Sequence, residues 1–373
     1  MLLQRFRARD FRNLRAVDLA PSPRATVVVG RNGQGKTNLL EAIYFLCTLR
    51  PLRGARLAEL VRFECDVALL GGRFTLGGAA RDIAVEIRAG SRQASVDGKR
   101  AASLEEYFGG VSVVAFTPDD LAVVKGAPEE RRSFLDRAVF NRLPGFLAAS
   151  RTYLRALRSR NRLLREGAPL EYLRAYEDAL ATAGGRILVL RRDLLEELAP
   201  RAVAVVASIA RLPGVAYRYA PAHLELPLAG ADESSLSRAL LEALRHRLPR
   251  DQERGFTSVG PHADDLEITI DGRPARAFAS QGQARALVLA WKIAEIENLR
   301  DVLGRFPLLL LDDVSSELDP ERNAFLMRYL AGSGAQVLLT TTEPSLVRAA
   351  SGPDTLWLGV EDGLVTPAAA SSG

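Results

Sequence analysis

Eight residues near the start of the chain have the types and spacing that suit phosphate binding. From Gly30 to Thr37 they read Gly-Arg-Asn-Gly-Gln-Gly-Lys-Thr and match the pattern G-x-x-x-x-G-K-[ST]. Glycines let backbone N–H groups close around phosphate oxygens, and the start of a following helix adds positive potential. Lys36 is expected to reach the β and γ phosphates of a nucleotide, and Thr37 to offer its hydroxyl to Mg²⁺. The predicted contacts are Gly30, Arg31, Asn32, Gly33, Gln34, Gly35, Lys36, Thr37 and Asn38.

The flanking residues have the pattern that such a loop requires. Ala25 to Val29 is a short β-branched apolar run, typical of a buried parallel strand. Asn38 to Leu49 carries apolar residues at the spacing of one helical face. A glycine-rich turn that happens to contain Lys-Thr is the alternative, and it would not need this strand and helix.

Two carboxylates complete the predicted site. Pro307 to Leu311 is an apolar run ending in Asp312 and Asp313, which predicts a central strand that brings acids to its carboxyl end. We assign Asp312 to Mg²⁺ and Asp313 to polarising the attacking water, so that Lys36 and Asp313 are the predicted catalytic residues. The alternative is that the paired acids cap the following turn.

A second phosphate-suited segment lies between these halves. Ser280, Gln281, Gly282 and Gln283 precede an amphipathic helix, with Ser280 as a good N-cap and Gly282 permitting close backbone approach. One nucleotide needs only one cradle. We therefore expect the γ phosphate to be shared with another subunit across a two-fold interface.

Composition is compatible with nucleic-acid binding without demonstrating it. The 373 residues are 47% apolar, with a net charge of +5. No window holds eighteen uninterrupted apolar residues, and the two cysteines have no metal-type neighbours. We expect a cytoplasmic protein without membrane partners.

Hydrophobic periodicity and the positions of turn residues predict a split α/β head. Short runs from Val67 to Val96, with an Asp97-Gly98 turn, predict an antiparallel β subdomain, and Leu2 to Leu19 predicts strands beside the nucleotide strand. Residues 129–212 have a helical period, with expected breaks that include Gly184-Gly185. The expected domains are a head of residues 1–122 and 250–373, and a mostly helical inserted lobe of residues 123–249.

Arginines mark two candidate DNA contacts. One is a basic loop with Arg50, Arg53 and Arg56. The other is the outer face of a helix whose seam is Leu147, Leu154, Leu157 and Leu164; to that face we assign Arg151, Arg155, Arg158, Arg160, Arg162 and Arg165. A merely solvated face is the alternative for this second group.

These motifs together resemble a known family. Further matching segments are Phe11 to Leu14, Thr117 to Leu121, Arg160 to Leu164, Gly260 to His262 and Leu310 to Asp319. The ATPase motifs are similar to the SMC branch of ABC-type ATPases, and the short helical insertion with Gly-Pro-His resembles the RecF family from end to end. The expected fold class is α/β, an ABC/SMC-type P-loop ATPase head with an antiparallel β subdomain and a mostly helical inserted second lobe.

The resemblance implies a function. It implies ATP and Mg²⁺ as cofactors, slow ATP hydrolysis, and an ATP-dependent homodimer in which Ser280 to Gln283 contact the nucleotide of the opposite protomer. It further implies binding to double-stranded and gapped duplex DNA, and action with RecR and RecO to place RecA. An ATPase subunit of another ABC-type machine, for transport or chromosome structure, is the alternative, and a phosphotransferase is a third.

The chain departs from the superfamily pattern at several positions. Ala279 and Gln281 replace the usual residues of the signature motif, and Asp313 stands where a glutamate is usual. No histidine follows Val337 to Thr342, so we expect Thr341 or Thr342 at the switch position. No glutamine precedes Thr117 to supply a further metal contact.

Overall fold

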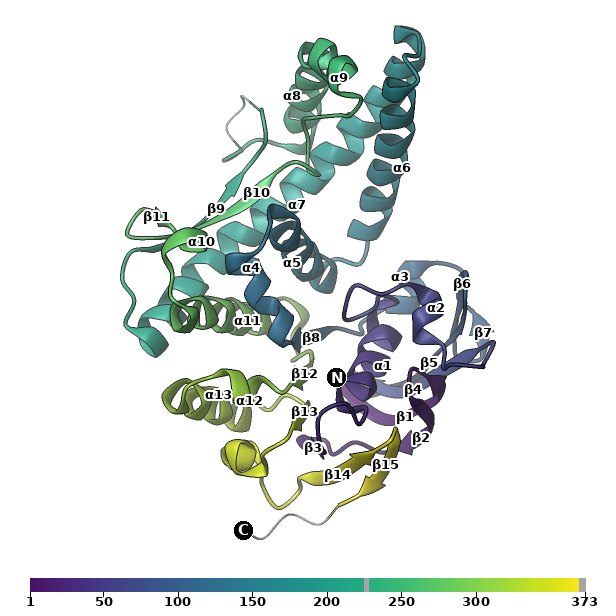
Figure 1. Cartoon of the computed structure of the whole chain (residues 1–373), viewed down its shortest axis with the longest axis vertical. Coiled ribbons are helices and arrows are strands. Elements are labelled where there is room, and N and C mark those ends of the chain that lie inside the picture. Colours follow the sequence, from purple (N-terminus) through teal and green to yellow (C-terminus); the bar gives the residue numbers. More distant parts are fainter. Residues whose placement is uncertain (225–227, 369–373) are drawn as a thin grey trace. The chain divides into compact units, whose positions relative to one another are not determined.

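The computed structural model describes residues 1–224 and 228–368, which form two compact units (Figure 1). The first unit contains Met1–Asp120 and the chain from Glu295 onward, and the second contains Leu121–Ala294. The second unit thus extends past residue 250, where the sequence predicted a return to the head. The reason is strand pairing, because β10 (Asp265–Ile270) pairs along its whole length with β9 (Val215–Ala220) of the second unit.

A six-stranded, mostly parallel sheet forms the centre of the first unit. Its strands, in pairing order, are β15 (Leu364–Pro367), β14 (Leu356–Glu361), β3 (Ala25–Val29), β13 (Val337–Thr341), β12 (Leu308–Asp312) and β8 (Val113–Phe116). Only β15 runs antiparallel to its neighbour. The strands from β3 to β8 are buried almost throughout, as their unbroken apolar runs require. Strands β3 and β12 both run parallel to β13, which lies between them. The phosphate loop and the paired acids therefore leave the same edge of the sheet.

Helix α1 (Lys36–Thr48) contacts both this sheet and a second, antiparallel one. The remaining helical segments of the first unit are α2 (Leu57–Leu60), α3 (Leu104–Phe108), η1 (Pro118–Leu121), α12 (Val314–Glu317), α13 (Pro320–Ser333) and η2 (Pro344–Ala350). The last residue of η1, Leu121, already belongs to the second unit. Helix α11 (Gln281–Leu303) begins in the second unit and ends in the first.

The second sheet is the predicted antiparallel subdomain. Its strands, in pairing order, are β2 (Leu14–Leu19), β1 (Leu2–Phe11), β4 (Ala68–Leu76), β5 (Ala79–Arg88), β6 (Ser91–Val96) and β7 (Lys99–Arg100). Asp97 and Gly98 both have positive φ, of 49° and 78°, and the predicted hairpin turn is confirmed. The prediction that residues 2–19 lie beside the nucleotide strand is wrong, because β1 pairs with β2 and β4. Buried and exposed residues alternate along β1, as expected for a sheet with one solvated face.

The second unit is mainly helical, as predicted. Its helices are α4 (Ala122–Lys125), α5 (Pro128–Arg142), α6 (Phe146–Arg165), α7 (Leu170–Ala210), α8 (Glu233–His246), α9 (Leu248–Arg254) and α10 (Ala275–Phe278), with β11 (Arg273–Pro274) beside β10. The predicted break at Gly184-Gly185 is wrong, since α7 runs through it. A Cβ on Gly185 would lie 3.0 Å from the Cα of Ser237 in α8, so these glycines permit close helix packing.

A buried polar network joins α5, α7 and the three-stranded sheet of β11, β10 and β9. Arg191 makes two bonds to the Asp136 carboxylate, of 2.7 and 3.0 Å, and donates to the Tyr219 hydroxyl at 3.0 Å. Tyr219 in turn donates to Asp264 at 2.6 Å. Burial raises the pKa of Asp264 to about 6.

No helix within the described ranges is long and apolar enough to cross a bilayer.

Candidate nucleotide-binding site and nucleic-acid interface

The phosphate loop connects β3 directly to α1. All three of its glycines are required by geometry: Gly33 and Gly35 have φ of 81° and 116°, and a Cβ on Gly30 would lie 2.5 Å from the Val360 carbonyl oxygen of β14. The Lys36 Nζ donates to the carbonyl oxygens of Gly30 at 2.7 Å and Arg31 at 3.0 Å. Burial lowers the pKa of Lys36, and the nearby Asp313 and Asp312 oppose that shift.

Residues distant in sequence brace the loop through Gln34. Its carbonyl oxygen accepts from Asn13 Nδ2 at 3.1 Å and from the Gly363 N–H at 2.8 Å. Its side-chain oxygen accepts from the Asp362 N–H at 2.8 Å. Asn13 also accepts from Asn38 at 2.8 Å, which ties the turn after β1 to the first turn of α1. These contacts hold the loop in shape, and sequence reasoning missed them.

Asp312 and Thr37 lie together, as the sequence predicted. The Thr37 hydroxyl donates to Asp312 Oδ1 at 2.8 Å. A hydroxyl and a carboxylate oxygen form a hard-oxygen donor pair of the kind that Mg²⁺ takes beside nucleotide phosphates. The two residues that the sequence assigned to the metal therefore fit that ion.

Thr340 links the two acids, and sequence reasoning did not single it out. Its hydroxyl donates to Asp312 Oδ1 at 2.9 Å and accepts the Asp313 N–H at 2.9 Å. Thr340 is buried and pairs with Asp312 in the parallel register of β13 and β12. The sequence proposed Thr341 or Thr342 for the switch position, and of these Thr341 bonds to the backbone of Glu343. No sequence signal singles out Thr340, because its place opposite Asp312 depends on the pairing of β13 with β12.

Asp313 has an unusual conformation for a non-glycine residue. Its φ is 48°, and its Oδ1 is buried without a hydrogen-bond partner in the part of the chain that the structure describes. Its side chain makes no capping bond to α12, which argues against the alternative of a turn cap. Burial raises the pKa of Asp313, and the Ser316 side chain and then Lys36 oppose the shift. A carboxylate oxygen with free acceptor capacity suits the predicted role in orienting water.

Glu41 anchors two arginines one turn after Thr37. It is fully buried and accepts from Arg12 at 3.0 Å and from Arg53 at 3.1 Å. Arg53 also donates to Asn38 at 2.9 Å, so this predicted DNA residue is tied to the helix that follows the phosphate loop. Of the other two arginines in this loop, Arg56 is exposed and Arg50 is half-buried.

The signature segment forms a capping box in the second unit. The Gln283 N–H donates to Ser280 Oγ at 3.1 Å, and the Ser280 N–H donates to Gln283 Oε1 at 2.8 Å. The prediction that Ser280 caps this helix is confirmed. Lys125 holds the preceding turn by bonding to the carbonyl oxygens of Ala275, Arg276 and Ala279. Gln281 and Gly282 follow on the first turn of α11.

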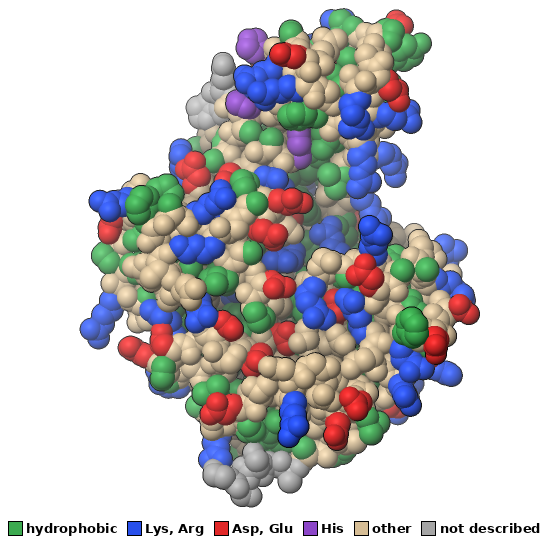
Figure 2. Space-filling model, viewed as in Figure 1, with side chains coloured by type: hydrophobic (Ala, Val, Ile, Leu, Met, Phe, Trp, Pro, Cys, Tyr) green, Lys and Arg blue, Asp and Glu red, His purple; other side chains and the backbone are tan. Residues whose placement is uncertain are grey.

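The α6 arginines divide into two groups. Arg151, Arg155 and Arg158 are exposed, and Figure 2 shows basic side chains along this helix. The assignment of Arg160 to the same face is wrong, because it is fully buried and donates to Asp251 at 2.9 Å and Thr257 at 2.7 Å. At about 100° per residue, nine positions place Arg160 half a turn away from Arg151, a period that grouping by charge ignored.

The predicted seam of leucines is wrong at one position, Leu154. Its side chain is 41% exposed, whereas Leu147, Leu157 and Leu164 are buried. Leu154 directly precedes Arg155 and lies at the edge of the arginine face, so three of the four seam positions pack.

Comparison with known proteins decides the family. The model of the RecF/RecN/SMC N-terminal domain matches residues 2–359. The chain is 65% identical over 369 residues to the DNA replication and repair protein RecF of Myxococcus xanthus, covering 98% of this chain and 97% of that protein. The chain belongs to the RecF family. The predicted resemblance to RecF is thereby confirmed.

Other RecF proteins and solved structures agree with this membership. The RecF of Geobacter sulfurreducens is 41% identical over 362 residues, covering 96% of this chain and 97% of that protein. A solved RecF–ATP structure from the RecFOR pathway matches with a TM-score of 0.87 and 30% identity, covering 98% and 99% of the two chains. An SMC head domain from Pyrococcus furiosus, at 16% identity, matches with a TM-score of 0.55 over 97% and 94% of the two chains, which shows the fold alone. The predicted ABC/SMC-type α/β fold is confirmed.

Proposed function

We propose that this chain is an ATP-dependent switch that closes into a homodimer and binds double-stranded and gapped duplex DNA during recombinational repair. Its relatives bear the name DNA replication and repair protein RecF, and the solved RecF–ATP structure is described as a recombination mediator. Membership of the RecF family over nearly the whole chain supports the same role here. Following the family resemblance, the partners would be RecR and RecO, and the outcome would be RecA placed on gapped DNA in the cytoplasm.

One observation supports the proposed dimer: the chain has two separate segments suited to binding phosphate. One is the loop at Lys36, and the other is the helix start capped by Ser280. A single nucleotide uses one such cradle, so the second segment is available to the nucleotide of another copy. The Ser280 hydroxyl accepts from Gln283 and keeps its own hydrogen for a phosphate oxygen.

The residues of the site divide the chemistry among them. When ATP binds, Lys36 exchanges the carbonyl oxygens of Gly30 and Arg31 for phosphate oxygens. Thr37 and Asp312 would hold Mg²⁺, which neutralises charge on the β and γ phosphates. Asp313 accepts a hydrogen bond from the attacking water through its unpartnered oxygen. An aspartate reaches less far than the usual glutamate, which is consistent with slow turnover.

Sedimentation velocity tests the proposal directly. The full chain is expected to sediment as a monomer without nucleotide or with ADP, and as a dimer with ATP and Mg²⁺. A monomer at saturating ATP and micromolar protein would reject the composite site.

ATPase rates measured in parallel address the rival function. Duplex DNA is expected to stimulate hydrolysis by the dimer. An ATPase subunit of a transport machine would show no response to DNA.

A further inference from the structure

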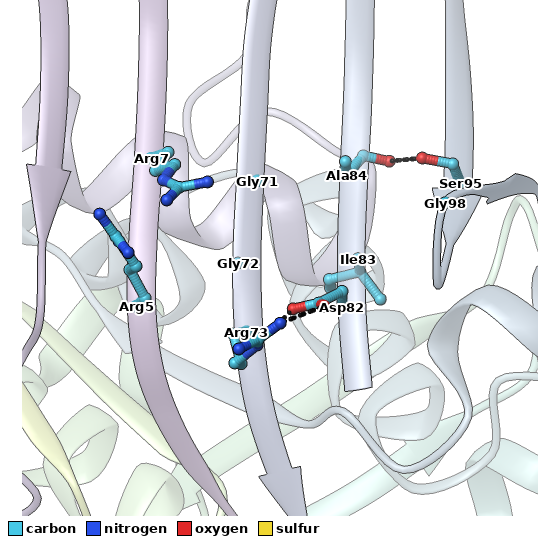
Figure 3. A pocket seen from close by; sticks show the side chains of 10 residues that line it. All are labelled: Arg5, Arg7, Gly71, Gly72, Arg73, Asp82, Ile83, Ala84, Ser95 and Gly98. Carbon is cyan, nitrogen blue, oxygen red and sulfur yellow. Dashed lines mark hydrogen bonds and ion pairs between the residues drawn. The ribbon is translucent and has the colours of Figure 1, made fainter. Parts of the chain in front are cut away.

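The outer face of the antiparallel sheet carries a hollow of about 390 Å³ lined by arginines. Its floor is a row of small residues on neighbouring strands, Gly71 of β4, Ala84 of β5 and Ser95 of β6. Arg7 of β1 lies opposite Gly71 in the same row. Figure 3 shows its side chain extending towards the strand that carries Gly71. We call this hollow the arginine trough.

Packing does not explain the glycine at the centre of the trough. A Cβ on the neighbouring Gly72 would lie 2.8 Å from Leu46, so the core requires that glycine. A Cβ on Gly71 would meet only the Ile83 carbonyl oxygen, at 4.0 Å, which is ordinary contact. Glycine within a strand costs stability, and it often marks a place where a ligand approaches the backbone. The absence of a side chain at Gly71 keeps the trough open.

The arginines around the trough differ in how fully they are engaged. Arg5 makes two bonds of 2.7 Å to Asp18, and Arg73 makes two to Asp82, of 2.9 and 2.8 Å. Among the residues that the structure describes, Arg7 bonds to Asp18 through Nε alone, at 3.3 Å, and its side chain is 61% exposed. A guanidinium has five N–H donors in a planar fork that matches two oxygens of a phosphate. Arg7 therefore offers a bidentate contact to an anion entering the trough.

We propose that the arginine trough binds the phosphodiester backbone of double-stranded DNA, with Arg7 as its main contact. The proposal deepens the proposed function and depends on it, since it adds a DNA surface on the unit that carries the phosphate loop. None of these arginines is among the DNA contacts predicted from the sequence.

The lining favours nucleic acid over a protein partner. Protein interfaces usually depend on buried aromatic or other large anchors in pockets, whereas phosphate contacts need only donors. All lining residues belong to the described part of the chain, and none is an exposed large apolar side chain. An acidic protein segment is the alternative occupant, and the following experiment distinguishes it from DNA.

Two variants test the trough in the full-length chain. Arg7→Ala removes the least engaged of the three guanidinium groups, and Gly71→Glu puts a negative side chain into the trough where the backbone tolerates one. The matched controls are Gly71→Ser and Arg88→Ala, because Arg88 lies on the same sheet face, outside the lining, and pairs with Glu86. The measurement is the affinity for a labelled DNA duplex with ATP over a series of salt concentrations.

Losing one phosphate contact should lower the slope of log affinity against log salt by about 0.9 for Arg7→Ala. Gly71→Glu should weaken binding roughly tenfold or more at low salt, where the added charge is least screened. Both controls should match the wild type. ATP-induced dimerisation and DNA-free hydrolysis should be unchanged in all four variants, which also verifies folding.

Wild-type slope and affinity in Arg7→Ala would overturn the proposal, even if Gly71→Glu failed to fold, and would leave an acidic protein segment as the occupant. Failure of the proposed function has a different signature, because the wild-type chain itself would then not bind duplex DNA with ATP.

Discussion

Replacing Thr340 with valine tests whether one buried hydroxyl positions both acids of the ATPase site. Valine has nearly the same shape, so the change removes a donor to Asp312 and an acceptor for the Asp313 N–H, with little change in packing. Thr340 is 2% exposed, and water cannot readily replace the lost partner. An unsatisfied buried N–H costs about 1–3 kcal/mol.

That cost should appear in two measurements. The free energy of unfolding without nucleotide should fall by about 2 kcal/mol in Thr340→Val. The Asp313 backbone is already in a left-handed conformation, with φ of 48°, and losing its anchor should misplace the carboxylate. We expect kcat to fall roughly tenfold to a hundredfold, about 1.4–2.7 kcal/mol of activation free energy, with a smaller change in KM for ATP.

Thr340→Ser is the matched control because it keeps the hydroxyl and loses only a methyl group. It should retain most of the wild-type kcat and should respond to Mg²⁺ concentration as the wild type does. The valine variant should need more Mg²⁺ for half-maximal rate, since Asp312 keeps only the Thr37 hydroxyl of its two donors. Full turnover in Thr340→Val, with unchanged Mg²⁺ dependence, would refute the positioning role.

Four further changes have definite expected outcomes. Lys36→Arg keeps the charge but misplaces it, so steady-state hydrolysis should fall more than equilibrium nucleotide binding; equal turnover would remove Lys36 from its role. Ser280→Arg should abolish the ATP-dependent dimer in sedimentation while the monomer keeps its nucleotide affinity, and a loss of that affinity would place Ser280 in its own protomer's site. Gly185→Ala should lower the free energy of unfolding by about 1–3 kcal/mol through overpacking against α8, whereas Gly332→Ala, a helical glycine with open space around it, should not; similar urea midpoints for both would contradict this packing. Asp264→Asn removes a carboxyl whose pKa burial raises to about 6, above roughly 3.9 in an unfolded chain, so that the folded state binds the proton more tightly. The wild type should therefore lose up to about 3 kcal/mol relative to this variant as pH rises from about 4 to 6, and urea unfolding at both ends of that window should show it; a constant difference would exclude the shift.

Where chemistry is local, the sequence was sufficient. Gly30 to Thr37 form the loop from their own glycines and flanking elements, and Ser280 caps its helix with a residue three positions away. The turn at Asp97-Gly98 likewise depends on two adjacent residues that tolerate positive φ. The capping box and the turn close within a few residues, and the loop's own motif predicts its type, although Asn13, Asp362 and Gly363 hold its shape.

Tertiary structure alone decided which distant residues meet. Thr340 reaches both acids only because β13 pairs with β12 in one parallel register, and a strand's sequence does not state its neighbour. Gln34 is braced from residues more than three hundred positions away. Gly71 and Gly72 are adjacent and identical in the sequence, yet one faces the core and the other opens the arginine trough. Such contacts depend on register, on the facing of a strand and on long-range packing, which are properties of the folded chain as a whole.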